Sequence, residues 1–140
     1  MESILSITLC IWLMLCSLQD VRSKKLSLIL VLAGFIIPVA GIIIAGNIAV
    51  IDRIAGLVLG LLLLLLCPVT GGQIGFGDGL VICITGLSLG FFKNAELLLL
   101  ALTISAVISG FLIVFRHVGR HKTIPFIPFM FLAYLGVLVF

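Results

Sequence analysis

The sequence predicts an all-α integral membrane protein, built as a bundle of six transmembrane helices. Composition is the first observation behind this class: of 140 residues, 64% are hydrophobic and only 9% are charged. A soluble domain has about 45–50% apolar and about 25% charged residues. Segmentation is the second, because six apolar stretches follow one another with almost no polar sequence between them. We therefore expect residues 1–140 to form a single membrane domain.

The six apolar stretches set the expected helices. A helix needs about 20 apolar residues to cross a bilayer, and we expect helices over about 3–18, 26–45, 54–69, 79–92, 97–115 and 124–140. Pro38 predicts a kink in the second helix. The fourth segment has 14 residues, which reach only about 21 Å of a core of about 30 Å. Either the bilayer thins there, or the preceding loop dips into the membrane face.

The basic residues lie mainly in alternate loops. Loops one, three and five together carry Arg22, Lys24, Lys25, Arg116, Arg120 and Lys122, whereas loops two and four carry only Arg53 and Lys93. Cytoplasmic loops are enriched in Lys and Arg, so we predict that both termini lie outside and that loops one, three and five are cytoplasmic. Asp20 in loop one and Asp78 in loop three then lie on the same cytoplasmic face.

Asp78 stands in a glycine-rich stretch of this apolar chain, Gly75-Phe76-Gly77-Asp78-Gly79-Leu80. An acid at membrane depth costs free energy and tends to mark function, and glycines leave room for close approach to the backbone. Two neighbouring carboxylates share a proton. One can then take a proton from an attacking water while the other donates one to a carbonyl oxygen. Asp20 and Asp78 are therefore the candidate catalytic pair.

Each aspartate also has a plainer explanation. Asp20, beside Arg22 and Lys24, is typical of a solvated interfacial acid, and Asp78 is typical of an N-cap for the fourth helix. We interpret Asp52, next to Arg53, as an interfacial charge where a short turn closes.

The other polar and small residues favour structural roles. The cysteines (Cys10, Cys16, Cys67 and Cys83) lie in apolar segments, and His117 and His121 lie in the basic fifth loop, so we expect no metal site. We expect a turn over residues 93–96. Small residues recur at four-residue spacing and predict close helix packing, in the pairs Gly56–Gly60, Gly86–Gly90, Ala101–Ser105 and Ala106–Gly110.

Four stretches, in this order, resemble the motifs of the prepilin leader peptidases, which are membrane aspartyl proteases of the GxGD type. The first is Asp20–Ser27, which is similar to Asp-x-Arg-x-x-x-Ile-Pro but has Leu26-Ser27 in place of Ile-Pro, and the second is Gly75, Gly77 and Asp78, with Leu80 at the position where Lys is common. The third is Ile84–Gly90, which is similar to the family's glycine-rich stretch. The fourth is Ile124–Phe129, which is similar to Ile-Pro-Phe-Gly-Pro-Phe but has Ile127 in place of Gly. These four stretches are spread, in the same order as the family's motifs, over nearly the whole chain.

The resemblance implies an aspartic endopeptidase of the cytoplasmic (inner) membrane, with Asp20 and Asp78 catalytic, Gly75, Gly77 and Gly79 supporting them, and no cofactor or metal. It implies prepilin or pseudopilin substrates with a basic leader before a hydrophobic helix, and no nucleic-acid partner. The short chain is similar to peptidases of tight-adherence (Flp-type) pilus systems and predicts peptidase activity without methyltransferase activity.

Two alternatives stay open at this point. One is an archaeal-type preflagellin peptidase, which has closely related chemistry. The other, from a different class, is a non-enzymatic membrane scaffold or ion-pathway protein that uses the same acids for packing or ion binding. The sequence leaves open which aspartate is the general base and what the oligomeric state is.

Overall fold

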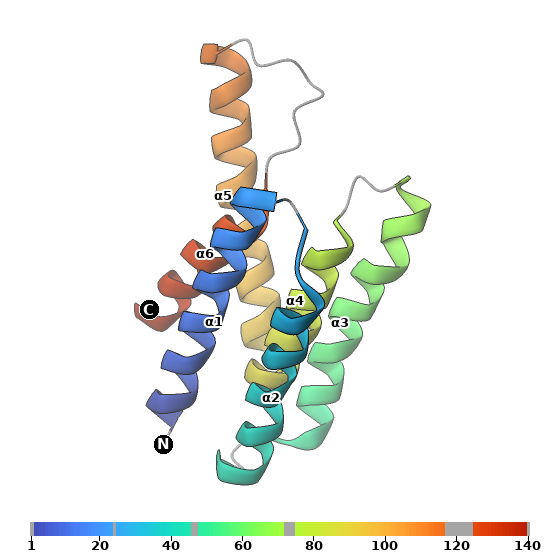
Figure 1. The fold of residues 1–140 in the computed structure, drawn as a ribbon, viewed down its shortest axis with the longest axis vertical. Coiled ribbons are helices and arrows are strands. Elements are labelled where there is room, and N and C mark those ends of the chain that lie inside the picture. Colours follow the sequence, from blue (N-terminus) through green and yellow to red (C-terminus); the bar gives the residue numbers. More distant parts are fainter. Residues whose placement is uncertain (1, 24, 46–47, 72–74, 117–124, 140) are drawn as a thin grey trace.

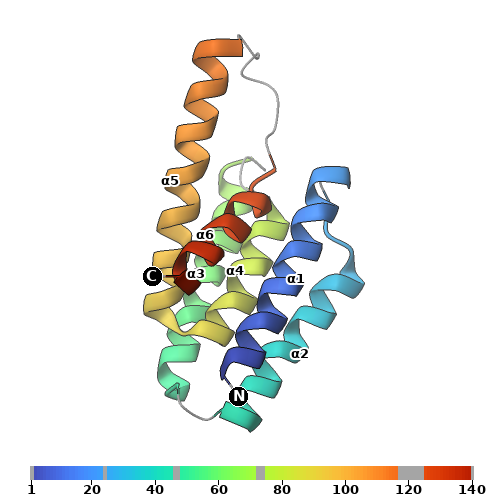
Figure 2. The same ribbon diagram turned by 90° about the vertical axis from the view of Figure 1, so that its left-hand side faces the viewer.

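The computed structural model describes residues 2–23, 25–45, 48–71, 75–116 and 125–139. These residues form six helices, as predicted: α1 (Glu2–Ser23), α2 (Leu28–Ala45), α3 (Val50–Val69), α4 (Phe76–Leu89), α5 (Phe91–Arg116) and α6 (Ile127–Val139). No strand occurs in these ranges. The end of α1 and the start of α4 lie at one end of the bundle, and the ends of α2 and α4 lie at the other (Figure 1). Figure 2 shows α6 crossing the lower part of α5.

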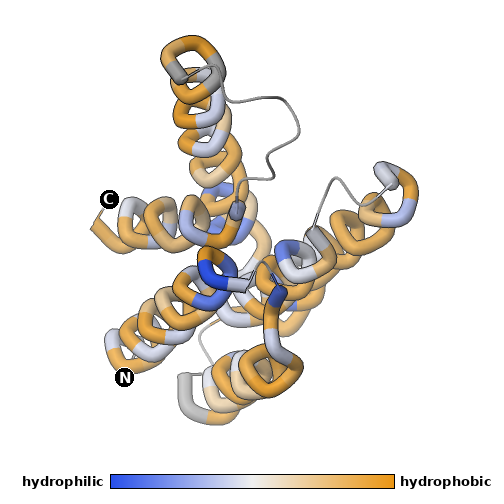
Figure 3. The backbone as a smooth tube through the Cα atoms, turned by 45° about the horizontal axis from the view of Figure 1, so that its top comes forward, coloured by the Kyte–Doolittle hydropathy of each residue, from blue (hydrophilic) through white to orange (hydrophobic). Residues whose placement is uncertain are grey.

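The outside of the bundle is apolar. Among the described residues, α1, α3 and α5 contain spans long and apolar enough to cross a membrane, and α2, α4 and α6 are shorter apolar helices. Large side chains such as Ile29, Ile51 and Phe92 are about 80% exposed, and most of each helix is coloured hydrophobic in Figure 3. An apolar surface of this extent needs lipid rather than water around it, so the chain is a multi-pass membrane protein.

Helices α3 and α4 pack with their backbones in contact. A Cβ atom placed on Gly56 would collide with the carbonyl group of Gly86, and one placed on Gly60 would lie 2.6 Å from Sγ of Cys83. The prediction that Gly56 and Gly60 allow close helix packing is therefore confirmed. A Cβ atom on Gly110 would meet nothing within 4 Å, so the same spacing in α5 makes no such contact.

A buried polar cluster joins α5 to this contact. The Asn94 side chain is fully buried. Its Oδ1 accepts a hydrogen bond from Thr85 Oγ1 (2.7 Å), and its Nδ2 donates to the carbonyl oxygens of Ile82 (3.2 Å) and Gly56 (3.4 Å). An amide is tolerated in apolar surroundings only when its polar atoms have partners. The predicted turn over 93–96 is therefore wrong, because this segment is helical and packs into the bundle.

The chain instead turns at Gly90, between α4 and α5. Its φ of 83° lies in the left-handed region that glycine adopts readily. The Asp52 carboxylate accepts a hydrogen bond from the backbone N–H of Phe91 (3.2 Å), and a Cβ atom on Gly90 would collide with that carboxylate. The expected turn at Asp52 and Arg53 is also wrong, because α3 already begins at Val50 and Asp52 caps the start of α5.

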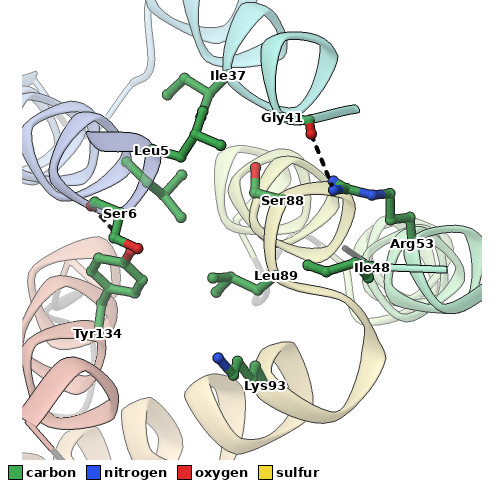
Figure 4. A pocket seen from close by; sticks show the side chains of 11 residues that line it. Leu5, Ser6, Ile37, Gly41, Ile48, Arg53, Ser88, Leu89, Lys93 and Tyr134 are labelled. Carbon is green, nitrogen blue, oxygen red and sulfur yellow. Dashed lines mark hydrogen bonds between the residues drawn. The ribbon is translucent and has the colours of Figure 1, made fainter. Parts of the chain in front are cut away.

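A cavity of about 150 Å³ lies at this end of the bundle, lined by side chains from all six helices. Arg53, although buried, donates a hydrogen bond to the carbonyl oxygen of Leu87 (2.7 Å). It also donates to the carbonyl oxygen of Gly41 (3.4 Å), as Figure 4 shows. Both carbonyls lie near helix C-termini, where the helix dipole favours a cation. Tyr134 of α6 donates to the Ser6 carbonyl of α1 (3.1 Å). These contacts tie the helices together at the end away from the two aspartates.

The backbone contact between α3 and α4 predicts a sharp difference between two glycine substitutions. Gly56→Ala should lower the free energy of unfolding by about 1–3 kcal/mol, because the added methyl group overpacks against the Gly86 backbone. Gly110→Ala adds the same methyl group where there is space, and should be neutral or stabilising by up to about 1 kcal/mol through helix propensity. Unfolding of both variants in the same detergent measures this difference, and equal stabilities would contradict the close packing of α3 on α4.

Candidate active site

Asp20 lies inside α1, near its C-terminal end. The helix continues past the predicted end at Leu18 as far as Ser23. There, the Ser23 hydroxyl donates toward the carbonyl oxygens of Gln19 (3.0 Å) and Lys25 (2.9 Å), which links the last turn to the following residues. Asp20 is only 8% exposed, so the interpretation as a solvated interfacial acid is wrong. Its carboxylate faces the interior of the bundle end.

Asp78 lies in the first turn of α4, and not in the preceding loop as predicted. The helix begins at Phe76, with Gly75 as its N-cap residue. From the third helical position, the Asp78 carboxylate accepts a hydrogen bond from the backbone of Gly75, as in a capping box. A Cβ atom on Gly75 would lie 2.8 Å from Oδ2 of Asp78. Gly75 therefore leaves room for the carboxylate to fold back over the helix start.

The other two glycines of the stretch admit neighbours from other parts of the chain. A Cβ atom on Gly77 would lie 2.9 Å from Cδ1 of Leu26, and one on Gly79 would lie 2.8 Å from Cγ of Leu64. Leu26 precedes α2, and Leu64 belongs to α3. The three glycines thus face three different contacts, and together they let the start of α4 fit between the α1–α2 connection and α3.

The residues between α1 and α2 connect the two aspartates indirectly. Ser27 caps α2, because its Oγ accepts a hydrogen bond from the backbone N–H of Leu30 (3.3 Å). The side chain of Gln19, next to Asp20, accepts a hydrogen bond from the Ser27 backbone N–H (3.3 Å). Leu26 between them packs on Gly77, next to Asp78. Leu26 therefore supplies a packing contact and Ser27 a helix cap, at the two positions where the family's motif has Ile-Pro.

The fold brings Asp20 and Asp78 together from α1 and α4. The two carboxylates are close enough for their negative charges to interact unfavourably. Two acids this near in partly buried surroundings do not both ionise readily, so the pair tends to hold one proton. One member could then act as a base while the other acts as an acid, which is the chemistry expected of two acids on one membrane face.

A third segment reaches the pair. The sequence singled out Ile124–Phe129 as one of the four motif-like stretches, but it did not indicate a contact between this segment and Asp20. The backbone N–H of Ile127, the first residue of α6, donates a hydrogen bond to Oδ2 of Asp20 (3.3 Å). The donor is a main-chain group, so the identity of residue 127 carries no sign of it. The prolines around this position did correctly predict a nearby helix start, since Pro128 is the second residue of α6.

The described residues contain no group of three or more His, Cys, Asp or Glu placed to hold a metal ion. Among the free thiols, Cys16 is buried, one turn before Asp20. His117 and His121, which the sequence assigns to a basic loop, lie outside the described residues.

A small apolar helix bundle with two interacting carboxylates at one end defines an integral membrane protein with a candidate two-carboxylate site. A model of the type IV leader peptidase family matches residues 7–114, a range that contains both Asp20 and Asp78. The chain therefore belongs to the type IV leader peptidase family and is a protease with prepilin-type substrates. Comparisons with curated proteins and with solved structures found no match.

The contact of Gly79 with Leu64 predicts an energetic coupling between α4 and α3. Gly79→Ala should destabilise the protein by about 1–3 kcal/mol, because the new Cβ atom overpacks against the Leu64 side chain. Leu64→Ala should relieve much of that cost, which gives an interaction free energy of about 0.5–3 kcal/mol in a double-mutant cycle. Unfolding of the wild type, both single variants and the double variant measures it, and additive effects would exclude the contact.

Proposed function

We propose that the protein is an aspartic endopeptidase that removes the leader of prepilins or pseudopilins at the cytoplasmic face of the inner membrane. Asp20 and Asp78 are its catalytic pair. The observation that supports this most is the meeting of the two carboxylates, one from the end of α1 and one from the start of α4, at one end of an apolar bundle. The family match supplies the class of reaction and of substrate.

The proposed reaction uses one water molecule and one proton held by the pair. The ionised carboxylate takes a proton from the water as its oxygen attacks the carbonyl carbon of the scissile peptide bond. The protonated carboxyl group gives its proton to the carbonyl oxygen, which forms a neutral tetrahedral intermediate. As the C–N bond breaks, the leaving amine takes the proton that the first carboxylate had removed from water, and one hydroxyl group of the intermediate returns its proton to the second carboxylate. The products are a carboxylic acid and an amine, and the pair again holds one proton. No covalent enzyme intermediate or metal takes part.

The position of the pair suits a bond beside a transmembrane helix. Both aspartates lie within one turn of the end of an apolar helix. A substrate can therefore keep its own hydrophobic helix in lipid while the peptide bond just beyond that helix reaches the carboxylates. The excess of basic residues in the loops at this end supports a cytoplasmic orientation.

Removing either catalytic carboxylate should abolish processing. Asp20→Asn and Asp78→Asn each preserve side-chain shape but remove the acid–base group, so leader cleavage should slow by about 10²–10⁴-fold. Cleavage of a purified prepilin by the purified protein in liposomes measures the rate. Asp52→Asn is the matched control: it removes an acid at the opposite end of the bundle and keeps an oxygen that can cap α5, so the rate should stay within a few-fold of wild type.

The same assay separates the proposal from its alternatives. Normal cleavage by either Asp20→Asn or Asp78→Asn would show that the pair is not catalytic. Absence of cleavage by the wild-type protein with both prepilin and preflagellin substrates would favour a non-enzymatic role. Faster cleavage of a preflagellin than of a prepilin would keep the two-aspartate chemistry and change the substrate.

A further inference from the structure

We propose that the first turn of α6 belongs to the active site, where the backbone N–H of Ile127 is a positioning group. It orients Asp20 and stabilises the singly ionised form of the aspartate pair. This inference rests on the proposed two-aspartate chemistry and extends it to a helix beyond the region that the family model matches, which ends at residue 114.

In the first turn of α6, the backbone N–H of Ile127 is the donor that can reach a carboxylate outside the helix. The first N–H groups of a helix have no acceptor within the helix. In α6, Pro128 has no N–H, and the N–H groups of Phe129 and Met130 both donate to the carbonyl oxygen of Phe126 (3.0 and 3.3 Å). The N–H of Ile127 instead donates to Oδ2 of Asp20 at 3.3 Å. The local sequence thus directs one donor toward the aspartate.

The donor comes from an element that is held firmly. Ile127, Met130 and Ala133 are at most 1% exposed, and the Tyr134 hydroxyl donates to the Ser6 carbonyl of α1 (3.1 Å). Helix α6 is therefore fixed along α1, the helix that carries Asp20. A hydrogen-bond donor on a fixed helix does not have to move when the carboxylate becomes negatively charged. Donors that are already in place stabilise the charge of a reacting group most effectively.

The charged groups around Asp20 differ in sign and in exposure. The charge of Asp20 opposes ionisation of Asp78 of α4 by like-charge repulsion, and Cys16 of α1 is a buried thiol one turn away from Asp20. Arg22 at the end of α1 and Lys25 before α2 are exposed to the surroundings. Helices α2 and α6 contain no charged residue within their bounds. What α6 brings to the carboxylate is therefore its N-terminal N–H and the positive end of its dipole.

The substitution Ile127→Pro removes this donor and little else from the helix. Proline is well accepted at the first position of a helix and has no N–H. A hydrogen bond to a charged group is strong, so kcat should fall by about 10- to 100-fold with little change in KM. The acid side of the pH–activity profile should move to higher pH, because the singly ionised pair has lost a donor. Ile127→Ala is the matched control, since it keeps the N–H and truncates the side chain.

A second variant avoids the change of side chain altogether. Replacing residue 127 with the α-hydroxy acid of isoleucine converts its N–H to an ester oxygen and keeps the side chain. The acid side of the pH–activity profile of this ester variant should move to higher pH, as for Ile127→Pro. The acid side of the profile of Ile127→Ala should stay at the wild-type pH, even if that variant is less stable. If the proline and ester variants both match Ile127→Ala, the hydrogen bond has no role in ionisation and the inference is wrong.

A direct measurement separates this inference from the proposed function. The carboxyl infrared band that disappears in Asp20→Asn reports the ionisation of Asp20 without any substrate. Its titration should move to higher pH in the ester variant and stay at the wild-type position in Ile127→Ala. An unchanged titration in the ester variant would overturn the inference even if both aspartates prove essential for cleavage. A shifted titration would support it even if no leader is cleaved.

Discussion

The backbone contact between α3 and α4 is the constraint on which the rest of the structure depends. Gly56 and Gly60 of α3 leave no side chain between the helices, so the backbones of Gly86 and Cys83 approach directly. This close approach brings the Gly56 carbonyl within reach of Asn94, which bonds α3, α4 and α5 into one unit. Lipid surrounds the outside and offers no hydrophobic gain for helix association, so close packing and internal hydrogen bonds have to hold the bundle together. The start of α4, with Asp78, is placed by this unit.

The same need for partners explains the contacts of Asp20, Asp52 and Arg53, of which Asp20 and Arg53 are buried. Asp52 accepts from the first N–H of α5, Asp20 accepts from the first N–H of α6, and Arg53 donates to a carbonyl near the end of α4. In each case a charged side chain satisfies a backbone group at the end of a different helix. Unpaired backbone groups are costly where water is absent, and the helix dipoles favour these signs of charge. Contacts between a charged side chain and the end of another helix therefore hold the helices together at one end of the bundle. At the other end, the same kind of contact positions a member of the candidate catalytic pair.

Glycines act by different means along the chain, although the sequence shows them as one pattern. Gly90 provides a left-handed turn, Gly75 leaves space for a carboxylate, and Gly79 admits Leu64. The glycine spacing around Asp78 thus reflects contacts with three separate partners. Gly110 makes no such contact in the described structure, which shows that four-residue spacing of small residues does not by itself establish a helix interface.

The sequence by itself determined the membrane class, the six helices and the two aspartates, because apolar segments of membrane length and rare acids among them are visible without knowing any contact. It also placed Asp20 and Asp78 on one side through the alternation of the helices. Only the tertiary structure decided where α1, α3, α4 and α5 begin or end. Those limits depend on caps and buried bonds from distant residues, such as Asp52 with Phe91 and Asn94 with Gly56. The link from Ile127 to Asp20 was likewise hidden, since a backbone N–H is common to almost every residue and its role comes from where the fold points it.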